Sequence, residues 1–175
     1  MSKIAERTTP FFTRPARRED AAEIARIYNE GIEDRVATFE TDLRTERDVL
    51  RWFDEGRTMV VVEGEGCVTA FASAFAYRRR ACYQGVREFS VYVSRDARGR
   101  GLGRLALESL IETARSRGDW KLLSRVFPEN KTSLDLLASL GFRQVGTYVR
   151  HAKLDGVWRD VVIVEKLIDE PAAGQ

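Results

Sequence analysis

The sequence has few of the residues that build metal centres and disulfide frameworks. Its 175 residues include two cysteines and one histidine. Cys67 and Cys82 are too far apart to form a CxxC pair, and a single histidine cannot complete a zinc site with them. We therefore expect no metal, reduced thiols and a cytoplasmic location. We also expect Cys82 to be a buried, unreactive thiol.

Long apolar segments are missing as well. No run approaches the roughly 20 apolar residues that span a bilayer. The first residues, MSKIAERTTPFFTRP, contain no signal-peptide core. The formal net charge is +2, so electrostatics gives no strong reason to expect nucleic acid. We expect neither a membrane nor a nucleic acid as a partner.

What remains is the composition of one soluble globular domain. Hydrophobic residues make up 43% of the chain and charged residues 32%, and the chain is long enough to bury one core. We expect the domain to occupy residues 11–168. The ends, residues 1–10 and residues 169–175, are expected to be flexible.

The hydrophobic pattern predicts strands alternating with helices. Period-2 runs predict strands at 11–14, 59–63, 67–77, 86–94, 121–127, 142–153 and 157–168. Helical spacing predicts helices at 18–31, 46–55, 103–117 and 131–140, with Gly56 ending the second and Gly141 ending the last. The order predicts a single α/β (α+β) domain. We expect a mixed, mostly antiparallel sheet flanked by helices, with a strand–helix–strand unit in its second half.

A segment rich in glycine and arginine, RGRGLGR at 98–104, joins a predicted strand to a predicted helix. Glycines permit positive φ, so successive N–H groups can converge on one point. The helix adds its positive end, and arginines add forked donors for phosphate oxygens. The segment therefore predicts a diphosphate cradle, the alternative being a solvated basic turn. It is neither a Walker loop nor a G-x-G-x-x-G fingerprint.

The spacing R-x-x-G-x-G, formed by Arg98, Gly101 and Gly103, resembles the pyrophosphate signature of the GNAT superfamily of N-acetyltransferases, which use acetyl-CoA. Asn130, followed by a helix that ends at Gly141, resembles a later motif in which an Asn contacts the CoA arm. The resemblance covers residues 11–168 and implies a GNAT-type domain with acetyl-CoA as co-substrate. The residues it implies for acetyl-CoA binding, including main-chain groups of the preceding strand, are Val91, Tyr92, Val93, Arg98, Gly99, Arg100, Gly101, Leu102, Gly103, Arg104, Asn130 and Ser133.

Further blocks narrow the resemblance. Residues 27–29, 37–39, 77–83 and 88–93 resemble the phosphinothricin and methionine sulfoximine acetyltransferases. Blocks in the second half of the chain resemble the arsinothricin N-acetyltransferase branch more closely. This resemblance implies a detoxifying enzyme that acetylates the α-amino group of a glutamate analogue. It also implies a homodimer whose active sites borrow residues from the partner.

Glu88 is the candidate catalytic base. Amine acetylation needs a neutral nucleophile, and a carboxylate beside the amine can remove its proton. Glu88 starts the strand that leads to the cradle, and the resemblance places the family's base there. The alternative is a surface glutamate paired with Arg87 or another cation.

The acceptor-binding candidates are Phe39, Arg78, Arg80 and Tyr83. Arg78 and Arg80 alternate on a strand or at its exit, so both can face one pocket and hold an anion between them. The alternative for the arginines is a solvated charge run. The alternative for Phe39 and Tyr83 is an ordinary place in the core.

Three questions stay open. The position that carries Tyr or His in related enzymes is Leu137, so the general acid for the CoA thiolate is unassigned. His151 lies in the penultimate predicted strand, and no catalytic role is expected for it. A peptide or protein N-acetyltransferase and a non-catalytic CoA-binding module are the alternative functions. The sequence does not choose between phosphinate, arsinate and sulfoximine acceptors.

Overall fold

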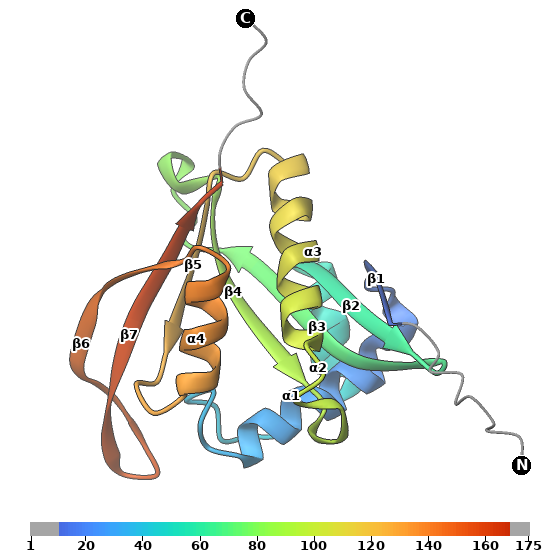
Figure 1. Ribbon diagram of the computed structural model, residues 1–175, viewed down its shortest axis with the longest axis horizontal. Helices are drawn as coiled ribbons and strands as arrows, with labels where there is room; N and C mark the ends of the chain where they lie inside the picture. Colours follow the sequence, from blue (N-terminus) through green and yellow to red (C-terminus); the bar gives the residue numbers. More distant parts are fainter. Residues whose placement is uncertain (1–10, 169–175) are drawn as a thin grey trace, which may run out of the picture.

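The computed structural model describes residues 11–168 as one seven-stranded sheet with helices on both faces (Figure 1). The expected flexible ends, residues 1–10 and 169–175, lie outside the described residues. The strands are β1 (Phe12–Pro15), β2 (Thr58–Gly64), β3 (Cys67–Ala76), β4 (Val86–Val93), β5 (Lys121–Val126), β6 (Arg143–Leu154) and β7 (Val157–Leu167). The helices are α1 (Ala21–Glu33), α2 (Glu46–Asp54), α3 (Leu102–Ser116) and α4 (Lys131–Ser139). Short 3-10 turns lie at Arg18–Asp20, Ala81–Tyr83 and Arg95–Ala97.

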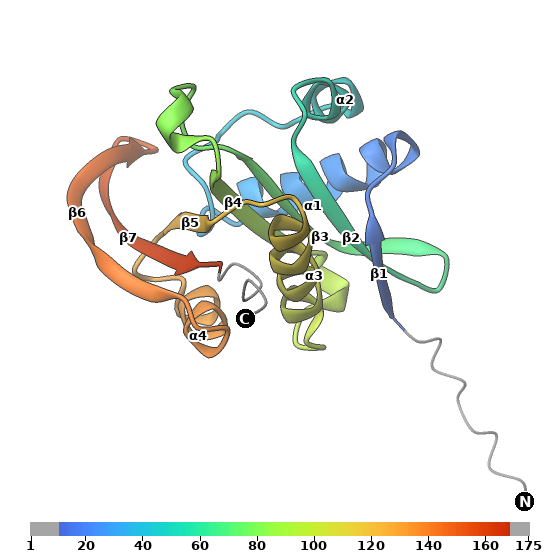
Figure 2. The same ribbon diagram turned by 90° about the horizontal axis from the view of Figure 1, so that it is seen from above.

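The sheet has the order β1-β2-β3-β4-β5-β7-β6. Only β4 and β5, which α3 connects, pair in parallel; the other neighbours are antiparallel. Seen from above, α1 and α2 cover one face, and α3 and α4 lie on the other (Figure 2). The mixed, mostly antiparallel sheet and its strand–helix–strand unit are therefore confirmed.

Alternation along β4 divides its side chains between the two layers. Phe89, Val91 and Val93 pack in the core beneath α3, whereas Tyr92 packs with α1 and α2. Glu88 shares the Tyr92 face because successive strand residues point to opposite sides of a sheet. One strand thus supplies both a hydrophobic layer and a row of polar groups.

Both predicted hairpins form through two-residue turns. Glu65 and Gly66 join β2 to β3, and Asp155 and Gly156 join β6 to β7. All four residues have positive φ, between 49° and 79°. Such turns match the right-handed twist of the strands they connect.

One predicted helix end was wrong. The first predicted helix ended at Gly31, but α1 continues to Glu33. A Cβ on Gly31 would lie 2.6 Å from Cε1 of Tyr92. This glycine therefore permits close packing of α1 on the sheet and does not end the helix.

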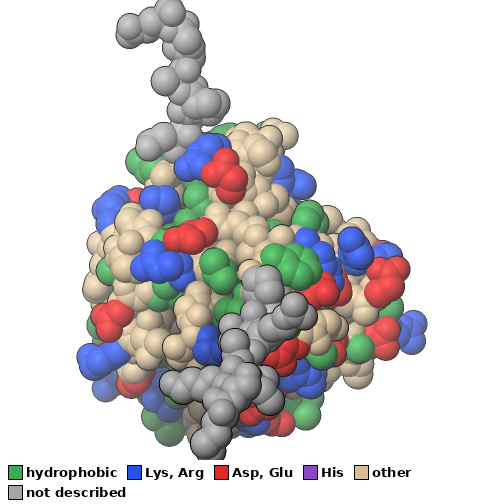
Figure 3. All heavy atoms as spheres, turned by 45° about the vertical axis from the view of Figure 1, so that its right-hand side comes forward, with side chains coloured by type: hydrophobic (Ala, Val, Ile, Leu, Met, Phe, Trp, Pro, Cys, Tyr) green, Lys and Arg blue, Asp and Glu red, His purple; other side chains and the backbone are tan. Residues whose placement is uncertain are grey.

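Positive and negative side chains are mixed over the face of the molecule drawn in Figure 3, as a net charge of +2 leads one to expect. No helix within residues 11–168 is long and apolar enough to cross a membrane. In the same residues, no three His, Cys, Asp or Glu side chains gather in a way that could hold a metal ion.

Candidate active site

The site is organised by the divergence of β4 and β5. The two strands pair only from Val86 to Glu88 on β4 and from Lys121 to Leu123 on β5, and then move apart (Figure 1). From Phe89 onward, no strand of residues 11–168 pairs with the edge of β4 that faces β5. The sheet thereby opens a cleft beside a strand whose main-chain groups on that edge are available.

Val91 and Val93 direct their main-chain groups into this cleft. The Ser94 N–H donates to the Thr69 carbonyl on the β3 side at 2.9 Å. Because main-chain groups of alternate strand residues point to opposite edges, the odd-numbered residues of β4 face the open edge. An extended ligand arm can therefore pair with the strand at Val91 and Val93.

The glycine–arginine segment has the backbone conformation that the predicted anion cradle requires at the start of α3. Gly99 and Gly101 have φ of 75° and 77°, as their proposed role requires. The main-chain N–H groups of residues 99 to 103 donate to no acceptor within the described part of the chain. A Cβ on Gly99 or Gly101 would meet nothing within 4 Å. N–H groups without an acceptor, the positive end of a helix and open space are suited to an anion such as the diphosphate of CoA.

The cradle opens into a groove of about 510 Å³. Its walls come from the end of α1, from β4, from the start of α3 and from α4. The predicted acetyl-CoA residues that line it are Val91, Tyr92, Val93, Arg98, Gly99, Gly101, Leu102, Gly103, Arg104, Asn130 and Ser133.

Arg100 is the one member of that predicted set that does not line the groove. Its guanidinium lies over the ring of Phe11, 4.5 Å from the ring centre. The turn at Gly99 and Gly101 points the side chain between them away from the cradle. The sequence could not show this, because the direction of a side chain in a glycine turn depends on φ at both neighbours.

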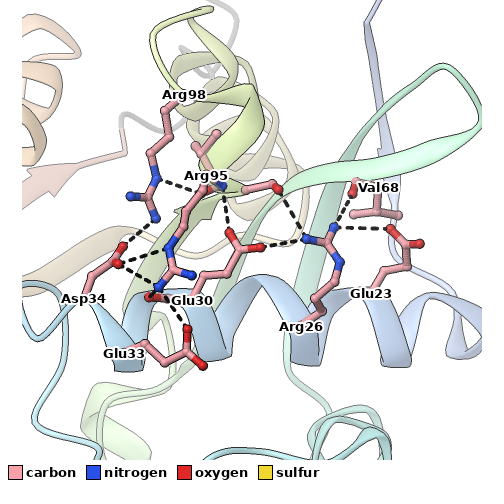
Figure 4. A network of polar contacts seen from close by, with 10 residues as sticks. Glu23, Arg26, Glu30, Glu33, Asp34, Val68, Arg95 and Arg98 are labelled. Atoms are coloured by element: carbon pink, nitrogen blue, oxygen red, sulfur yellow. Dashed lines mark hydrogen bonds and ion pairs between the residues drawn. The ribbon is translucent and has the colours of Figure 1, made fainter.

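A carboxylate directly after α1, that of Asp34, holds the cradle's first arginine (Figure 4). Asp34 forms an ion pair with Arg98 at 2.7 Å and accepts a hydrogen bond from Arg95 at 2.8 Å. Burial raises the pKa of Asp34, but hydrogen bonds from Arg95 and Arg98 outweigh it and lower that pKa overall. The network fixes the loop before α3 against the end of α1.

Asn130 begins α4 and ties it to the loop after α1. Its Oδ1 accepts from the Ser133 N–H at 3.2 Å, and its Nδ2 donates to the Val36 carbonyl at 3.2 Å. Both Asn130 and Ser133 line the groove. The amide is thus used within the protein, and its expected contact with the CoA arm stays a prediction.

A second hollow, a pocket of about 360 Å³, adjoins the groove along β4. The residues shared by the two are Ala37, Val91, Tyr92, Asn130 and Ser133. Glu88 and Phe39 line the pocket, as predicted. The arrangement is a long groove that ends in a compact polar chamber.

Glu88 lies in this chamber with the environment of a general base. Its carboxylate contacts Arg125 at 3.0 Å, and the glutamate side chain is 15% exposed. Burial raises the pKa of Glu88, and the nearby Arg125 charge partly opposes the rise. Arg87, the partner considered from the sequence, instead pairs with Asp119 at 2.7 Å. A carboxylate with a raised pKa near an open pocket is suited to accept a proton.

Serine residues of three strands line the same pocket as this carboxylate. Ser73 on β3 and Ser90 on β4 are direct partners across the strands, with their hydroxyl oxygens 3.2 Å apart. Ser124 on β5 also lines the pocket. The floor of the pocket therefore offers small hydrogen-bonding groups on three adjacent strands.

Arg78, Arg80 and Tyr83 lie outside the pocket, and here the structure differs from the prediction. Strand β3 ends at Ala76, so the alternation assumed for the two arginines does not extend to them. Arg78 lies over Tyr77, and Arg80 over Tyr83, at 5.1 and 6.0 Å from the ring centres. Both arginines are exposed in the single chain.

Cys82 belongs to the same loop and is exposed, not buried as expected. Its 3-10 turn, Ala81–Tyr83, contains no buried residue. The expectation failed because a turn between strands has no layer packed above it.

Two residues line the pocket that the sequence did not assign to it. Leu137 is buried at its wall and has no proton to offer. His151 reaches the pocket because β6 bulges between Tyr148 and Ala152, where Arg150 has φ of 49°. A period-2 pattern carries no signal of such a bulge.

Three arginines in the pocket were also missed: Arg44, Arg57 and Arg125. They come from the loop before α2, from the turn after α2 and from β5. Only the tertiary fold brings these segments together, and arginine is common throughout the sequence. No local motif could have singled them out.

Comparison with known proteins identifies the family. Residues 22–142 match the Acetyltransferase (GNAT) family. A phosphinothricin N-acetyltransferase of Alcaligenes faecalis is 32% identical over 159 residues, which cover 87% of this chain and 80% of that protein. An L-methionine sulfoximine/L-methionine sulfone acetyltransferase of Salmonella typhimurium is 32% identical over 167 residues, covering 90% and 95%.

A solved structure agrees with the fold. It is a GNAT superfamily phosphinothricin acetyltransferase from Sinorhizobium meliloti in complex with AcCoA, with a TM-score of 0.85 at 28% identity. The similarity covers 94% of this chain and 92% of that one. The resemblance first noted in the glycine–arginine segment is thus confirmed over more than half of the sequence. This chain belongs to the acetyltransferase (GNAT) family, whose members use acetyl-CoA, and it is an N-acetyltransferase.

Proposed function

We propose that this enzyme acetylates the α-amino group of a glutamate-like amino acid of the arsinothricin, phosphinothricin or methionine sulfoximine type. The single observation that carries the proposal is the placement of Glu88. Its partly buried carboxylate lies in the compact pocket where the groove ends. The names of the relatives support the class of acceptor.

Acetyl-CoA, when bound, supplies an acetyl group activated as a thioester. Glu88 accepts the proton that the acceptor ammonium must lose before its nitrogen can attack. Main-chain N–H groups on the open edge of β4 orient the arm and can stabilise a developing negative oxygen. Leu137 provides no proton, so the thiolate leaves without help from that position; a free thiol has a pKa of about 8.5, which makes the need modest.

The size of the pocket supports a small acceptor over a peptide. A chamber of about 360 Å³, walled by Phe39 and by residues of five strands, accommodates a single amino acid. Arginines at its wall suit the anionic groups of a glutamate analogue.

Acetyl-CoA turnover with separate acceptors tests the proposal. L-Phosphinothricin, L-methionine sulfoximine and arsinothricin are each compared with glutamate and with a pool of peptides. We expect N-acetylated products from the analogues and little turnover of peptides. Efficient acetylation of peptides alone would contradict the proposal.

We also propose that the enzyme detoxifies its acceptor in the cytoplasm, with residues 11–168 as the whole catalytic domain. Acetylation removes the positive charge of the α-amino group, which an enzyme that binds glutamate needs in order to recognise the analogue. Expression in a sensitive bacterium should therefore raise its tolerance of the preferred analogue. An unchanged tolerance, in cells that contain active enzyme, would contradict this role.

We further propose a homodimer formed through the β6–β7 hairpin. This hairpin curves away from the body of the molecule (Figure 2) and exposes large apolar side chains: Val145, Tyr148, Val149, Val157 and Trp158. A self-association surface of this kind would be covered in the dimer. It adjoins His151 at the pocket, so a partner would lie close to the acceptor. Sedimentation at micromolar concentration should show a dimer, and Trp158→Glu should shift it to monomer.

A further inference from the structure

Among the described residues that line the pocket, one positive charge has no carboxylate paired with it in the pocket itself. Arg44 pairs with Glu40, and Arg125 pairs with Glu88, and both of these carboxylates line the pocket themselves. Arg57 is the third arginine of the pocket wall. Its position at the pocket wall, the contacts that hold its side chain in place and its N–H donors without acceptors point to a role in binding.

The main chain at Arg57 is fixed by the end of α2. The Gly56 N–H donates to the Phe53 carbonyl at 3.0 Å, and the Arg57 N–H donates to the Trp52 carbonyl at 3.1 Å. Gly56 has φ of 74°. This is the pattern of bonds that ends many helices at a left-handed glycine. The turn sets the direction in which the Arg57 side chain leaves the chain.

The guanidinium is held between two aromatic rings. It lies 4.7 Å from the ring centre of Trp52 and 5.0 Å from that of Phe75. Such contacts stabilise the cation and fix the plane of its fork. The side chain is 24% exposed, so it is neither buried in the core nor freely solvated.

Only one edge of this guanidinium is used. Nε donates to Oε2 of Glu55 at 3.1 Å, and the Glu55 side chain lies outside the pocket and is more than half exposed. Across residues 11–168, neither Nη group of Arg57 has an acceptor. A preorganised fork with free donors at a pocket wall is suited to an oxyanion.

The fork lies one strand away from the base. Phe75 on β3 is the direct partner of Glu88 on β4. Arg57 lies over the Phe75 ring and therefore flanks Glu88 on the β3 side, opposite Arg125 on β5. An acceptor whose amine meets Glu88 can place an anionic group at Arg57.

We propose that Arg57 is a specificity-determining residue that binds an anionic group of the acceptor through its Nη donors. The group is the α-carboxylate or the side-chain oxyanion, which share this chemistry. The inference rests on the proposed function. It assigns to Arg57 the task that the sequence suggested for Arg78 and Arg80, which lie outside the pocket.

The test compares Arg57→Gln and Arg57→Lys with the parent enzyme. Arg51→Gln is the matched control, because Arg51 is an exposed arginine of α2 that pairs with Asp48 and lines neither hollow. Three acceptors are used: L-phosphinothricin, with both anionic groups; L-methionine sulfone, with the α-carboxylate only; and L-methionine sulfone carboxamide, with neither. Each kcat/KM is divided by the value for the carboxamide in the same preparation, which cancels any loss of folded enzyme.

Arg57→Gln should lower this ratio about 10- to 100-fold, as expected for loss of a charge-assisted hydrogen bond. A fall for both acids assigns the α-carboxylate, and a fall for phosphinothricin alone assigns the side-chain oxyanion. Arg57→Lys should recover part of the ratio, because an ammonium keeps the charge and lacks the fork. Arg51→Gln should leave the ratio at the parent value.

An unchanged ratio in Arg57→Gln would overturn the inference, even if kcat/KM fell equally for all three acceptors. Equal losses would mean that Arg57 only supports the fold around Trp52 and Phe75. A fall of the same size in Arg51→Gln would overturn it too. If the parent enzyme acetylates none of the three acceptors, the proposed function fails and the inference fails with it.

Discussion

Gly101→Ala should weaken acetyl-CoA binding without removing any protein contact. Gly101 has φ of 77°, and a Cβ there would meet no atom within 4 Å. The substitution therefore acts through the backbone: a non-glycine residue in the left-handed region costs about 1–2 kcal/mol. The N–H groups of the cradle have no acceptor in the described chain, so the free loop can relax and the cost falls on binding. Since 1.4 kcal/mol is tenfold, the Kd of acetyl-CoA should rise about 5- to 30-fold.

Gly118→Ala is the matched control. Gly118 has φ of 78° and equally open surroundings, but it lies after α3 and away from the groove. Calorimetry should show parent-like acetyl-CoA affinity for this variant. Its Tm should fall, because the turn after α3 keeps the alanine in the left-handed conformation and the backbone strain therefore stays in the folded protein. The cradle assignment would be refuted by an unchanged Kd in folded Gly101→Ala, or by an equal rise in Gly118→Ala.

Three further variants test other parts of the site. Arg125→Gln removes the charge that opposes the burial-raised pKa of Glu88, so the acid limb of kcat/KM should move to higher pH; a pH profile that does not move would show that Glu88 is not the titrating base. Gly31→Ala would place a Cβ 2.6 Å from the buried Tyr92 ring. We therefore expect the free energy of unfolding to fall by about 1–3 kcal/mol and kcat/KM to fall as well. A parent-like melting curve would argue against this packing. Arg80→Ala should change the acceptor KM less than about threefold, because the side chain is exposed outside the pocket and is assigned no charge-assisted bond. A rise of the acceptor KM near the tenfold expected for loss of such a bond would show that Arg80 does bind the acceptor.

The local pattern was enough to predict the elements of the fold. Alternation in β4 and helical spacing in α3 are properties of short segments, and burial of each apolar face decides the structure locally. The positive φ of Gly99 and Gly101 was also predictable, because few other residues tolerate it. Glu88 was singled out from its place at the start of the strand that leads to the cradle, and its role as the base stays a prediction.

The remaining errors concern contacts between distant segments. The first predicted helix ended at Gly31, but the role of this glycine depends on Tyr92, which is far along the chain. Arg57 becomes a pocket residue only after α2 ends against β3. His151 depends on a bulge in β6. In each case the deciding neighbour is set by tertiary packing and leaves no periodic signal.

Glu88→Gln is the most direct test of the account, because it keeps the size of the side chain and removes the proton acceptor. With the preferred acceptor, kcat at neutral pH should fall about 100-fold or more, the usual scale of general-base catalysis. The Kd of acetyl-CoA should stay at the parent value, since Glu88 lines the pocket and not the groove. A variant with near-parent kcat, measured where chemistry limits the rate, would contradict the assignment of Glu88 as the base.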